Sequence, residues 1–232
     1  MKLAKYLANL GYGTRRDVEQ MIRRREVTRA DGSPVAEGDD VQHDELRVRG
    51  VALDPAPDSV LMLNKPVGYV CSSRDAQRLV YELLPPRLLS RSPVMAPIGR
   101  LDRDTSGLLL LTDDGRLNHR LTSPRSHVAK TYEVTLAESL RGDEGELFAS
   151  GTLVLESELT PLAPARLEVL GDRSARLTIT EGRYHQVRRM FVAAGNHVVA
   201  LHRSGVGQLE LGALPSREWR LLGDDDLAAL LG

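Results

Sequence analysis

The sequence predicts an α+β protein in which a small N-terminal module precedes a larger domain built on a mainly antiparallel sheet. In the first 25 residues, apolar side chains recur at helical spacing. After residue 59, short apolar or alternating segments typical of strands follow one another too closely for regular βαβ crossovers. Between them, segment 54–58 contains two prolines, which oppose helix and central strand alike. We therefore expect two units, residues 1–58 and 59–232.

Two short helices and one strand are expected in the first unit. Leucines at helical spacing predict the first helix, and they are Leu3, Leu7 and Leu10. Thr14 and Asp17 have the spacing of a capping box, which predicts that a second helix begins there. Alternating residues over 46–49 are typical of a strand.

The second unit contains several predicted strands and one clear helix. The strands are expected at 60–63, 108–111, 131–136, 167–170 and 176–180. Over 185–194 the apolar residues recur with the period of a helix, and Gly195 stands where a C-terminal cap belongs. The sequence thus predicts a helix that interrupts a β-rich domain.

Composition and charge limit the class of protein. Of 232 residues, 41% are hydrophobic and 27% charged, which is ordinary for a soluble globular protein. Cys71 is the single cysteine, and no segment approaches the roughly 18 apolar residues of a membrane span, so we expect a cytoplasmic protein. The formal net charge is −1, but residues 1–30 contain eight Lys or Arg against three acids. This basic segment is typical of either a nucleic-acid contact or solvated helix faces.

A polar loop between Gly99 and Gly107 could carry chemistry, because it runs directly into the apolar segment 108–111. Asp102 and Asp104 lie two residues apart in it. They could supply an acid and a base, or one could act as a nucleophile that an arginine keeps ionised. The loop alone is equally compatible with a surface turn that makes weak ion pairs.

Together with four other segments, this loop resembles the pseudouridine synthases that act on small-subunit ribosomal RNA. In these enzymes an RNA-binding module of the S4 type precedes the catalytic domain. The matching segments follow one another in the expected order and are 3–50, 63–69, 99–107, 122–125 with 130–132, and 181–191. The resemblance implies a small α/β S4-like module followed by a synthase domain, whose mainly antiparallel mixed sheet is flanked by helices.

The resemblance also implies an activity, which is isomerisation of one uridine of 16S ribosomal RNA, of the uridine-516 type, to pseudouridine. It implies that Asp102 is the catalytic carboxylate, that Tyr132 stacks on the flipped uracil and that Arg188 pairs with Asp102. The residues expected to bind substrate are Lys65, Arg100 and Arg183 and, in the first module, Arg15, Arg16, Arg23 and Arg24. From the sequence pattern alone, we would expect Tyr132 to be a buried residue of a strand and Arg188 to be a solvent-exposed residue of a helix.

No cofactor or metal is expected, because the six histidines lack a metal-ligand spacing and no nucleotide-binding glycine pattern occurs. His185 is expected to be a hydrogen-bonding residue rather than a general base. Asp102 would either attack C1′ or remove the C2′ proton, and the sequence does not choose. The expected partner is ribosomal RNA or a small-subunit assembly intermediate, bound by a monomer without a membrane.

Three rival functions remain. An enzyme of the same kind could act on 23S ribosomal RNA. A ribosome-assembly factor could keep the fold without catalysis, although Asp102 argues against this. A glycoside hydrolase could use Asp102 and Asp104, but sugar sites usually stack aromatic rings, which make up only 4% of this chain.

Overall fold

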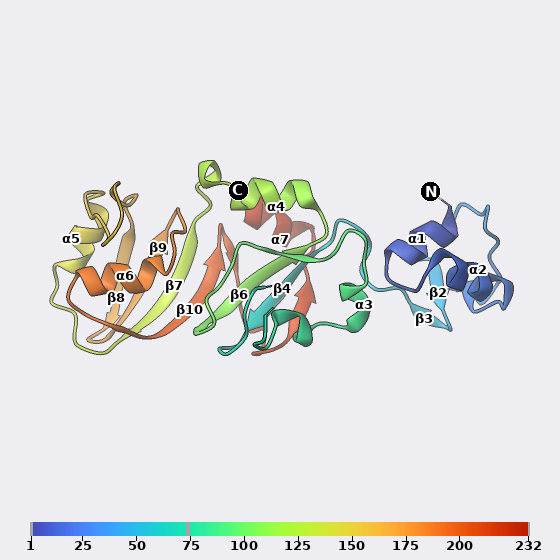
Figure 1. Ribbon diagram of the computed structural model, residues 1–232, viewed down its shortest axis with the longest axis horizontal. Helices are drawn as coiled ribbons and strands as arrows, with labels where there is room; N and C mark the ends of the chain where they lie inside the picture. Colours follow the sequence, from blue (N-terminus) through green and yellow to red (C-terminus); the bar gives the residue numbers. More distant parts are fainter. Residues whose placement is uncertain (1, 73–74, 232) are drawn as a thin grey trace.

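The computed structural model describes residues 2–72 and 75–231 and contains two separate sheets. A three-stranded sheet lies within residues 27–52, and a nine-stranded sheet begins at Val60. Figure 1 shows the small sheet with its two helices at one end of an elongated molecule, joined to the large sheet by the chain after β3 (Val51–Ala52). The small sheet has one buried apolar cluster, and the large sheet has two.

The N-terminal module packs two helices against its small sheet. Its further elements are α1 (Leu3–Asn9), α2 (Arg15–Arg23), β1 (Val27–Arg29) and β2 (Leu46–Val48). The two predicted helices are confirmed. Thr14 Oγ1 accepts a hydrogen bond from the Asp17 backbone N–H at 3.2 Å, and the Thr14 N–H donates to Asp17 Oδ2 at 2.8 Å. This is the predicted capping box, and it fixes the start of α2.

The large sheet is mixed, and only one of its strand pairs is parallel among the described residues. Its strands are β4 (Val60–Lys65), β5 (Ala96–Ile98), β6 (Thr105–Thr112), β7 (Lys130–Leu136), β8 (Arg166–Gly171), β9 (Ser174–Ile179), β10 (Val198–Val206), β11 (Leu209–Glu210) and β12 (Trp219–Leu221). The order is β12-β4-β6-β10-β7-β9-β8, with β5 beside β6 and β11 beside β10. β6 and β10 run parallel and the other pairs antiparallel, which confirms the predicted mainly antiparallel sheet.

Helices cover both faces of this sheet. They are α3 (Pro86–Leu89), α4 (Gly115–Thr122), α5 (Glu144–Ala149), α6 (Gln186–Ala193) and α7 (Asp224–Leu231), with short 3-10 turns at Val80–Leu83 and Pro124–Ser126. Alternate residues of β4 separate two apolar clusters, because successive side chains of a strand point to opposite faces. Leu61 and Leu63 join the cluster that contains Phe148 of α5 and Phe191 of α6. On the other face, the cluster contains residues of α4 and α7 (Figure 1).

The centre of the sheet was not predicted in full, since β10 was missed. β10 lies between β6 and β7 and pairs with both. Arg203 of β10 lies opposite Gly107 of β6 on one side and opposite Tyr132 of β7 on the other. Gly107 has φ +105°, and a Cβ atom there would overlap the Arg203 carbonyl group. Only glycine permits this close approach of β6 and β10.

The junction between the two units is fixed by polar contacts around α3. Ser92 N–H donates to the Asn9 carbonyl at 2.9 Å. The Arg87 guanidinium lies 4.7 Å from the centre of the Tyr12 ring and forms an ion pair with Asp54. The buried Arg91 forms an ion pair with Asp113 at 2.8 Å and also donates to the carbonyls of residues 55 and 56. These contacts hold the connecting segment against the large domain.

Candidate active site

The Asp102 loop is a tight turn at the N-terminal end of β6. The Thr105 N–H donates to the Asp102 carbonyl at 3.1 Å, and the Gly68 N–H donates to the Arg103 carbonyl at 2.7 Å. The first bond closes the turn, and the second ties it to the segment that follows β4. The Asp102 carboxylate remains about one-third exposed, so it can meet a substrate.

Lys65 holds this loop through hydrogen bonds to backbone carbonyls. Its side chain is fully buried, and its Nζ donates to the carbonyls of Thr105 at 2.7 Å, Asp102 at 3.0 Å and Pro66 at 3.1 Å. Burial lowers the pKa of Lys65 to about 8, while the nearby Asp102 and Asp104 carboxylates oppose that shift. All three ammonium protons are used within the protein. We expected Lys65 to bind substrate, and the geometry instead makes it a residue that holds the Asp102 loop.

The side-chain partner of Asp102 is His185, which the sequence did not pair with it. His185 Nε2 lies 3.4 Å from Asp102 Oδ1. His185 directly precedes α6 and has a left-handed backbone, with φ +49°, that turns its ring out of the helix. Its ring stacks on that of Tyr184, with centroids 3.8 Å apart and planes at 18°. His185 thus places its ring beside the Asp102 carboxylate, and the hydrogen bonding expected of it stays a prediction.

Arg188 does not pair with Asp102 as the resemblance implied. Its Nη2 lies 2.9 Å from Asp104 Oδ2 and donates to the Asp104 carbonyl at 3.1 Å, while Nη1 donates to the Val198 carbonyl at 3.0 Å. No ion pair joins Arg188 to Asp102 within the described part of the chain. The reason is the register of α6 on the loop, because Arg188 lies about one turn after His185 and therefore meets the second carboxylate. Arg188 joins β10 to the loop through Asp104.

Tyr132 lies in the sheet close to the same loop. It belongs to the buried cluster that includes Leu101, the residue before Asp102, and it is only 7% exposed. Across the sheet it stands opposite Arg203, which in turn stands opposite Gly107. Its ring therefore packs on the face that also carries α6. The contact with a flipped uracil that the resemblance implies remains a prediction.

The two arginines of this domain that were expected at the substrate, Arg100 and Arg183, differ in their surroundings. Arg100 is exposed two residues before Asp102, and Arg103 is exposed directly after it. Arg183 is committed to the protein, because its guanidinium donates to the carbonyls of Thr160 at 2.9 Å and Pro161 at 2.6 Å. Arg100 forms no ion pair with another described residue and can meet an anionic ligand, whereas Arg183 braces segment 156–161.

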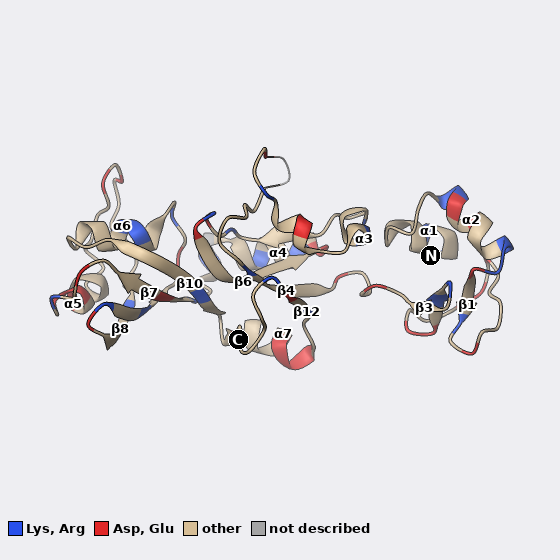
Figure 2. Ribbon diagram, turned by 90° about the horizontal axis from the view of Figure 1, so that it is seen from below, with Lys and Arg blue, Asp and Glu red and all other residues tan. Residues whose placement is uncertain are grey.

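The basic residues of the N-terminal module lie far from this loop in the fold. Arg15, Arg16, Arg23 and Arg24 are all exposed, at the two ends of α2 (Figure 2). Among the described residues none of them forms an ion pair. The structure therefore does not bring these arginines into the Asp102 site. If they bind RNA, they contact a part of it that is distant from the target uridine.

The sequence reasoning also missed an arginine pair at Tyr69. Arg217 Nη2 donates to the Tyr69 hydroxyl at 3.1 Å, and its guanidinium lies 5.7 Å from the centre of the ring. Arg78 lies 6.0 Å from the same ring. Tyr69 is close in sequence to Gly68, which bonds to the Asp102 loop. Arg217 lies 148 residues from Tyr69 in the sequence, so no local pattern could have drawn attention to its contact with that ring.

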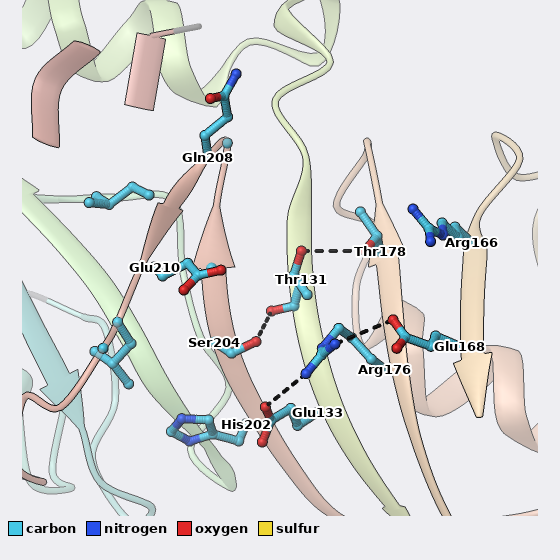
Figure 3. A pocket seen from close by; sticks show the side chains of 15 residues that line it. Thr131, Glu133, Arg166, Glu168, Arg176, Thr178, His202, Ser204, Gln208 and Glu210 are labelled. Carbon is cyan, nitrogen blue, oxygen red and sulfur yellow. Dashed lines mark hydrogen bonds and ion pairs between the residues drawn. The ribbon is translucent and has the colours of Figure 1, made fainter. Parts of the chain in front are cut away.

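A separate polar hollow of about 540 Å³ lies on the opposite face of the sheet (Figure 3). Thr131 and Glu133 line it, and they flank Tyr132 on β7, so strand alternation turns them away from the Tyr132 face. Arg176 in this hollow is paired with Glu168 at 3.3 Å and with Glu133 at 3.8 Å. Asp102 is not among the residues that line this hollow, so the hollow is separate from the Asp102 site.

Within residues 2–72 and 75–231, no group of three or more His, Cys, Asp or Glu side chains is arranged to hold a metal ion. In the same residues, no helix has the length and apolar character that crossing a membrane requires.

The arrangement can perform acid, base or nucleophilic chemistry on a polyanion. It offers one carboxylate that is fixed by its backbone and by His185, with the exposed Arg100 and Arg103 on either side. A carboxylate such as that of Asp102 can attack an electrophilic carbon or remove a proton. The flanking arginines suit phosphate groups.

Comparisons with known proteins agree on one family. Residues 59–193 match the family model described as RNA pseudouridylate synthase. The chain is 42% identical over 233 residues to a protein of Pasteurella multocida named ribosomal small subunit pseudouridine synthase A, with 98% of each chain covered. It is 40% identical to an uncharacterized RNA pseudouridine synthase of Bacillus subtilis, covering 99% of this chain and 98% of that protein.

A solved structure gives the same result over the whole chain. The crystal structure of a pseudouridylate synthase superimposes with a TM-score of 0.70 at 38% sequence identity, and the match covers 99% of both chains. The family model covers the Asp102 loop, Tyr132 and all of α6, which are the parts that build the site. This chain therefore belongs to the RNA pseudouridylate synthase family and is an RNA pseudouridine synthase.

Proposed function

We propose that this enzyme isomerises one specific uridine of small-subunit (16S) ribosomal RNA to pseudouridine, at a position of the uridine-516 type, with Asp102 as the catalytic carboxylate. The observation that carries the choice of RNA is the match along nearly the entire chain to proteins named for the small ribosomal subunit. Besides the Pasteurella protein, an Escherichia coli protein of that name is 48% identical over 173 residues, which is 73% of each chain.

The geometry around Asp102 supports its catalytic role. Lys65 and the Thr105 N–H both bond the Asp102 carbonyl, so the backbone that presents the carboxylate is rigid. Asp102 then attacks C1′ to form an ester, or removes the C2′ proton to leave a double bond between C1′ and C2′, and in either case the bond between C1′ and N1 of uracil breaks with its electron pair on uracil. The freed uracil rotates and its C5 attacks C1′, which breaks the ester bond in the first route and is accompanied by return of the proton to C2′ in the second. C5 then loses its proton and N1 gains one. A uridine in folded RNA must leave its stack for this, and Tyr132 is the ring that we expect to receive it.

The accessory parts of the proposal concern binding and place of action. Residues 1–58 form the RNA-binding module, of the S4 type, and residues 59–232 form the catalytic domain. Ribosomal RNA or a small-subunit assembly intermediate is the partner, the enzyme works as a monomer in the cytoplasm, and no cofactor takes part.

The experiment is to map pseudouridine in ribosomal RNA from a strain that lacks the gene. One position of small-subunit RNA should lose its pseudouridine, and a plasmid carrying the wild-type gene should restore it. A plasmid carrying Asp102→Asn should not. Loss of a position in 23S ribosomal RNA would show that the enzyme acts on the large subunit instead, and an unchanged map would remove both RNAs from the proposal.

A further inference from the structure

Tyr184 and His185 form a column of two rings that begins at Asp102 and ends at solvent. His185 meets the Asp102 carboxylate at 3.4 Å, and its ring stacks on that of Tyr184 with centroids 3.8 Å apart. Tyr184 is 76% exposed. One face of the tyrosine ring is therefore covered by His185, and an aromatic face remains open one ring away from the catalytic carboxylate.

This column is held rigidly by arginines on both sides of it. Arg189 donates to the Tyr184 carbonyl at 3.2 Å and to the Glu156 carbonyl at 2.5 Å. Arg183 is tied to the carbonyls of Thr160 and Pro161, and its own N–H donates to the Gln186 side chain at 2.8 Å. Segment 156–161 thus braces the backbone that carries both rings. A rigid aromatic ring binds a flat ligand with little loss of conformational entropy.

The chemistry of the open face fits a nucleobase. Every base presents a π face, and proteins that bind unstacked RNA bases hold them on Tyr, Phe, Trp or His rings. Exposed arginines near Asp102, Arg100 and Arg103, can meet the phosphates of the same strand. We propose that Tyr184 stacks on the base of a nucleotide adjacent to the target uridine, and that His185 is a positioning residue linking this stack to Asp102. This inference rests on the proposed function.

The position of the column favours an adjacent base over the uracil itself. The reacting ribose must lie at Asp102, and Tyr132, in the sheet beside Leu101, is the ring expected for its uracil. The His185 ring lies between Asp102 and the Tyr184 ring, so Tyr184 is farther from the carboxylate. When a uridine leaves its stack, each neighbouring base loses a stacking partner. Tyr184 can replace that partner and so stabilise the opened strand.

The test measures RNA binding by Tyr184 variants. Affinity is measured in the Asp102→Asn background, so that substrate is not consumed, with a short RNA that contains the mapped uridine. Tyr184→Ala should weaken binding by roughly 5- to 100-fold, the range expected for one base stacked on an aromatic ring. Tyr184→Phe should bind as the parent does, whereas Tyr184→Leu should lose most of the affinity because it keeps apolar surface without a π face. Val169→Ala, at another exposed apolar position of the domain, is the control.

A second RNA identifies the nucleotide that Tyr184 contacts. The same oligonucleotide is made without the base at the position before or after the uridine. For one of the two abasic RNAs, the parent enzyme should bind as weakly as Tyr184→Ala binds the complete RNA. On that abasic RNA, Tyr184→Ala should bind no more weakly than the parent. Equal affinity of parent and Tyr184→Ala on the complete RNA would overturn the inference, as would the same loss on both abasic RNAs.

The role of His185 is tested by kinetics with active enzyme. His185→Ala should lower kcat more than it raises KM, since the variant releases the Asp102 carboxylate, and His185→Gln should restore part of kcat because its amide can occupy the place of Nε2. An unchanged kcat in His185→Ala would remove His185 from the site. Failure of the proposed function would look different, because wild-type enzyme would then leave small-subunit ribosomal RNA unmodified.

Discussion

Arg188 is bound to Asp104 through two atoms of that residue, with Nη2 lying 2.9 Å from the carboxylate oxygen Oδ2 and 3.1 Å from the carbonyl oxygen. The other end of its guanidinium donates to the Val198 carbonyl at the start of β10. Arg188 therefore ties α6, β10 and the Asp102 loop together without meeting the Asp102 carboxylate. Its effect on catalysis would act through the position of the loop.

Arg188→Lys should reduce kcat by about 10- to 100-fold, because hydrogen bonds to charged groups contribute about 1.5–3 kcal/mol and lysine cannot span the same acceptors with a planar fork. The change keeps the positive charge, so a loss would show that geometry matters more than charge. The measurement is single-turnover pseudouridine formation. Turnover equal to that of the wild type would show that the loop keeps its position without this arginine.

The two carboxylates of the loop should respond differently to loss of charge. Asp102→Asn should reduce turnover at least about a thousand-fold with little change in RNA affinity, because the amide keeps the shape and removes the nucleophile or base. Asp104→Asn should retain most turnover, since Arg188 still has the Asp104 and Val198 carbonyls as acceptors. Turnover and RNA affinity are compared on one transcript, and equal loss of turnover in both variants would contradict the assignment.

Lys65 should give the enzyme an alkaline limit. Burial lowers the pKa of Lys65 to about 8, so the ammonium loses a proton, and with it one of its three bonds to the loop, as the pH rises through that value. We expect kcat to fall above about pH 8. Lys65→Met fills similar space without the hydrogen-bond donors. This variant should have a lower kcat at all pH values, and its kcat should not fall further above about pH 8. A wild-type rate that stays flat to pH 10 would contradict the prediction.

Stability should change in the opposite direction over the same range. The unfolded lysine titrates near 10.5, so between about pH 8 and 10.5 the unfolded chain binds more protons at this position than the folded chain. The contribution of Lys65 to the free energy of unfolding therefore rises with pH in that window. Denaturant unfolding of the wild type and Lys65→Met should show the steeper rise in the wild type. This separates loss of activity from loss of fold.

The strands that the sequence predicted share a plain apolar or alternating pattern, and β10 shows why another was missed. Its second half contains His202, Arg203, Ser204 and Gly205, which is unusual for the central strand of a sheet. Arg203 is nevertheless 3% exposed, and its Nε donates to the Leu108 carbonyl at 2.7 Å. A partner 95 residues away thus makes this strand possible, and periodicity carries no information about such a contact.

The candidate site was predictable to a similar extent. The resemblance to the synthase family pointed to Asp102, whereas the loop alone left the roles of Asp102 and Asp104 open. The side-chain partner of Asp102 could not be predicted, since the choice between His185 and Arg188 depends on the register with which α6 packs on the loop. That register follows from the left-handed backbone of His185 and from the bonds of Arg188 to β10. Both are set by tertiary packing.

The N-terminal module should supply affinity rather than the choice of uridine. Arg15, Arg16, Arg23 and Arg24 are exposed on α2 and form no ion pair among the described residues, so their charges are available to RNA phosphates. Phosphate contacts position a protein on RNA and carry no sequence information. Replacing Arg15 and Arg16 by Glu should therefore weaken binding. It should also flatten the slope of log affinity against log salt by roughly 0.7 to 0.9 for each lost contact.

The matched control for this pair replaces Arg47 and Arg49 of the same module, of which Arg49 already pairs with Glu26 at 2.8 Å. An arginine that is held by a carboxylate has less charge to offer a phosphate, so the control should change the salt slope less. Binding is titrated at several salt concentrations, and the modified uridine is mapped for each variant. An unchanged slope in the Arg15 and Arg16 variant would mean that this face of α2 is only solvated. A module that contacts only phosphates would leave the choice of uridine to the catalytic domain. A shifted site of modification would therefore mean that the N-terminal module also helps to select the uridine.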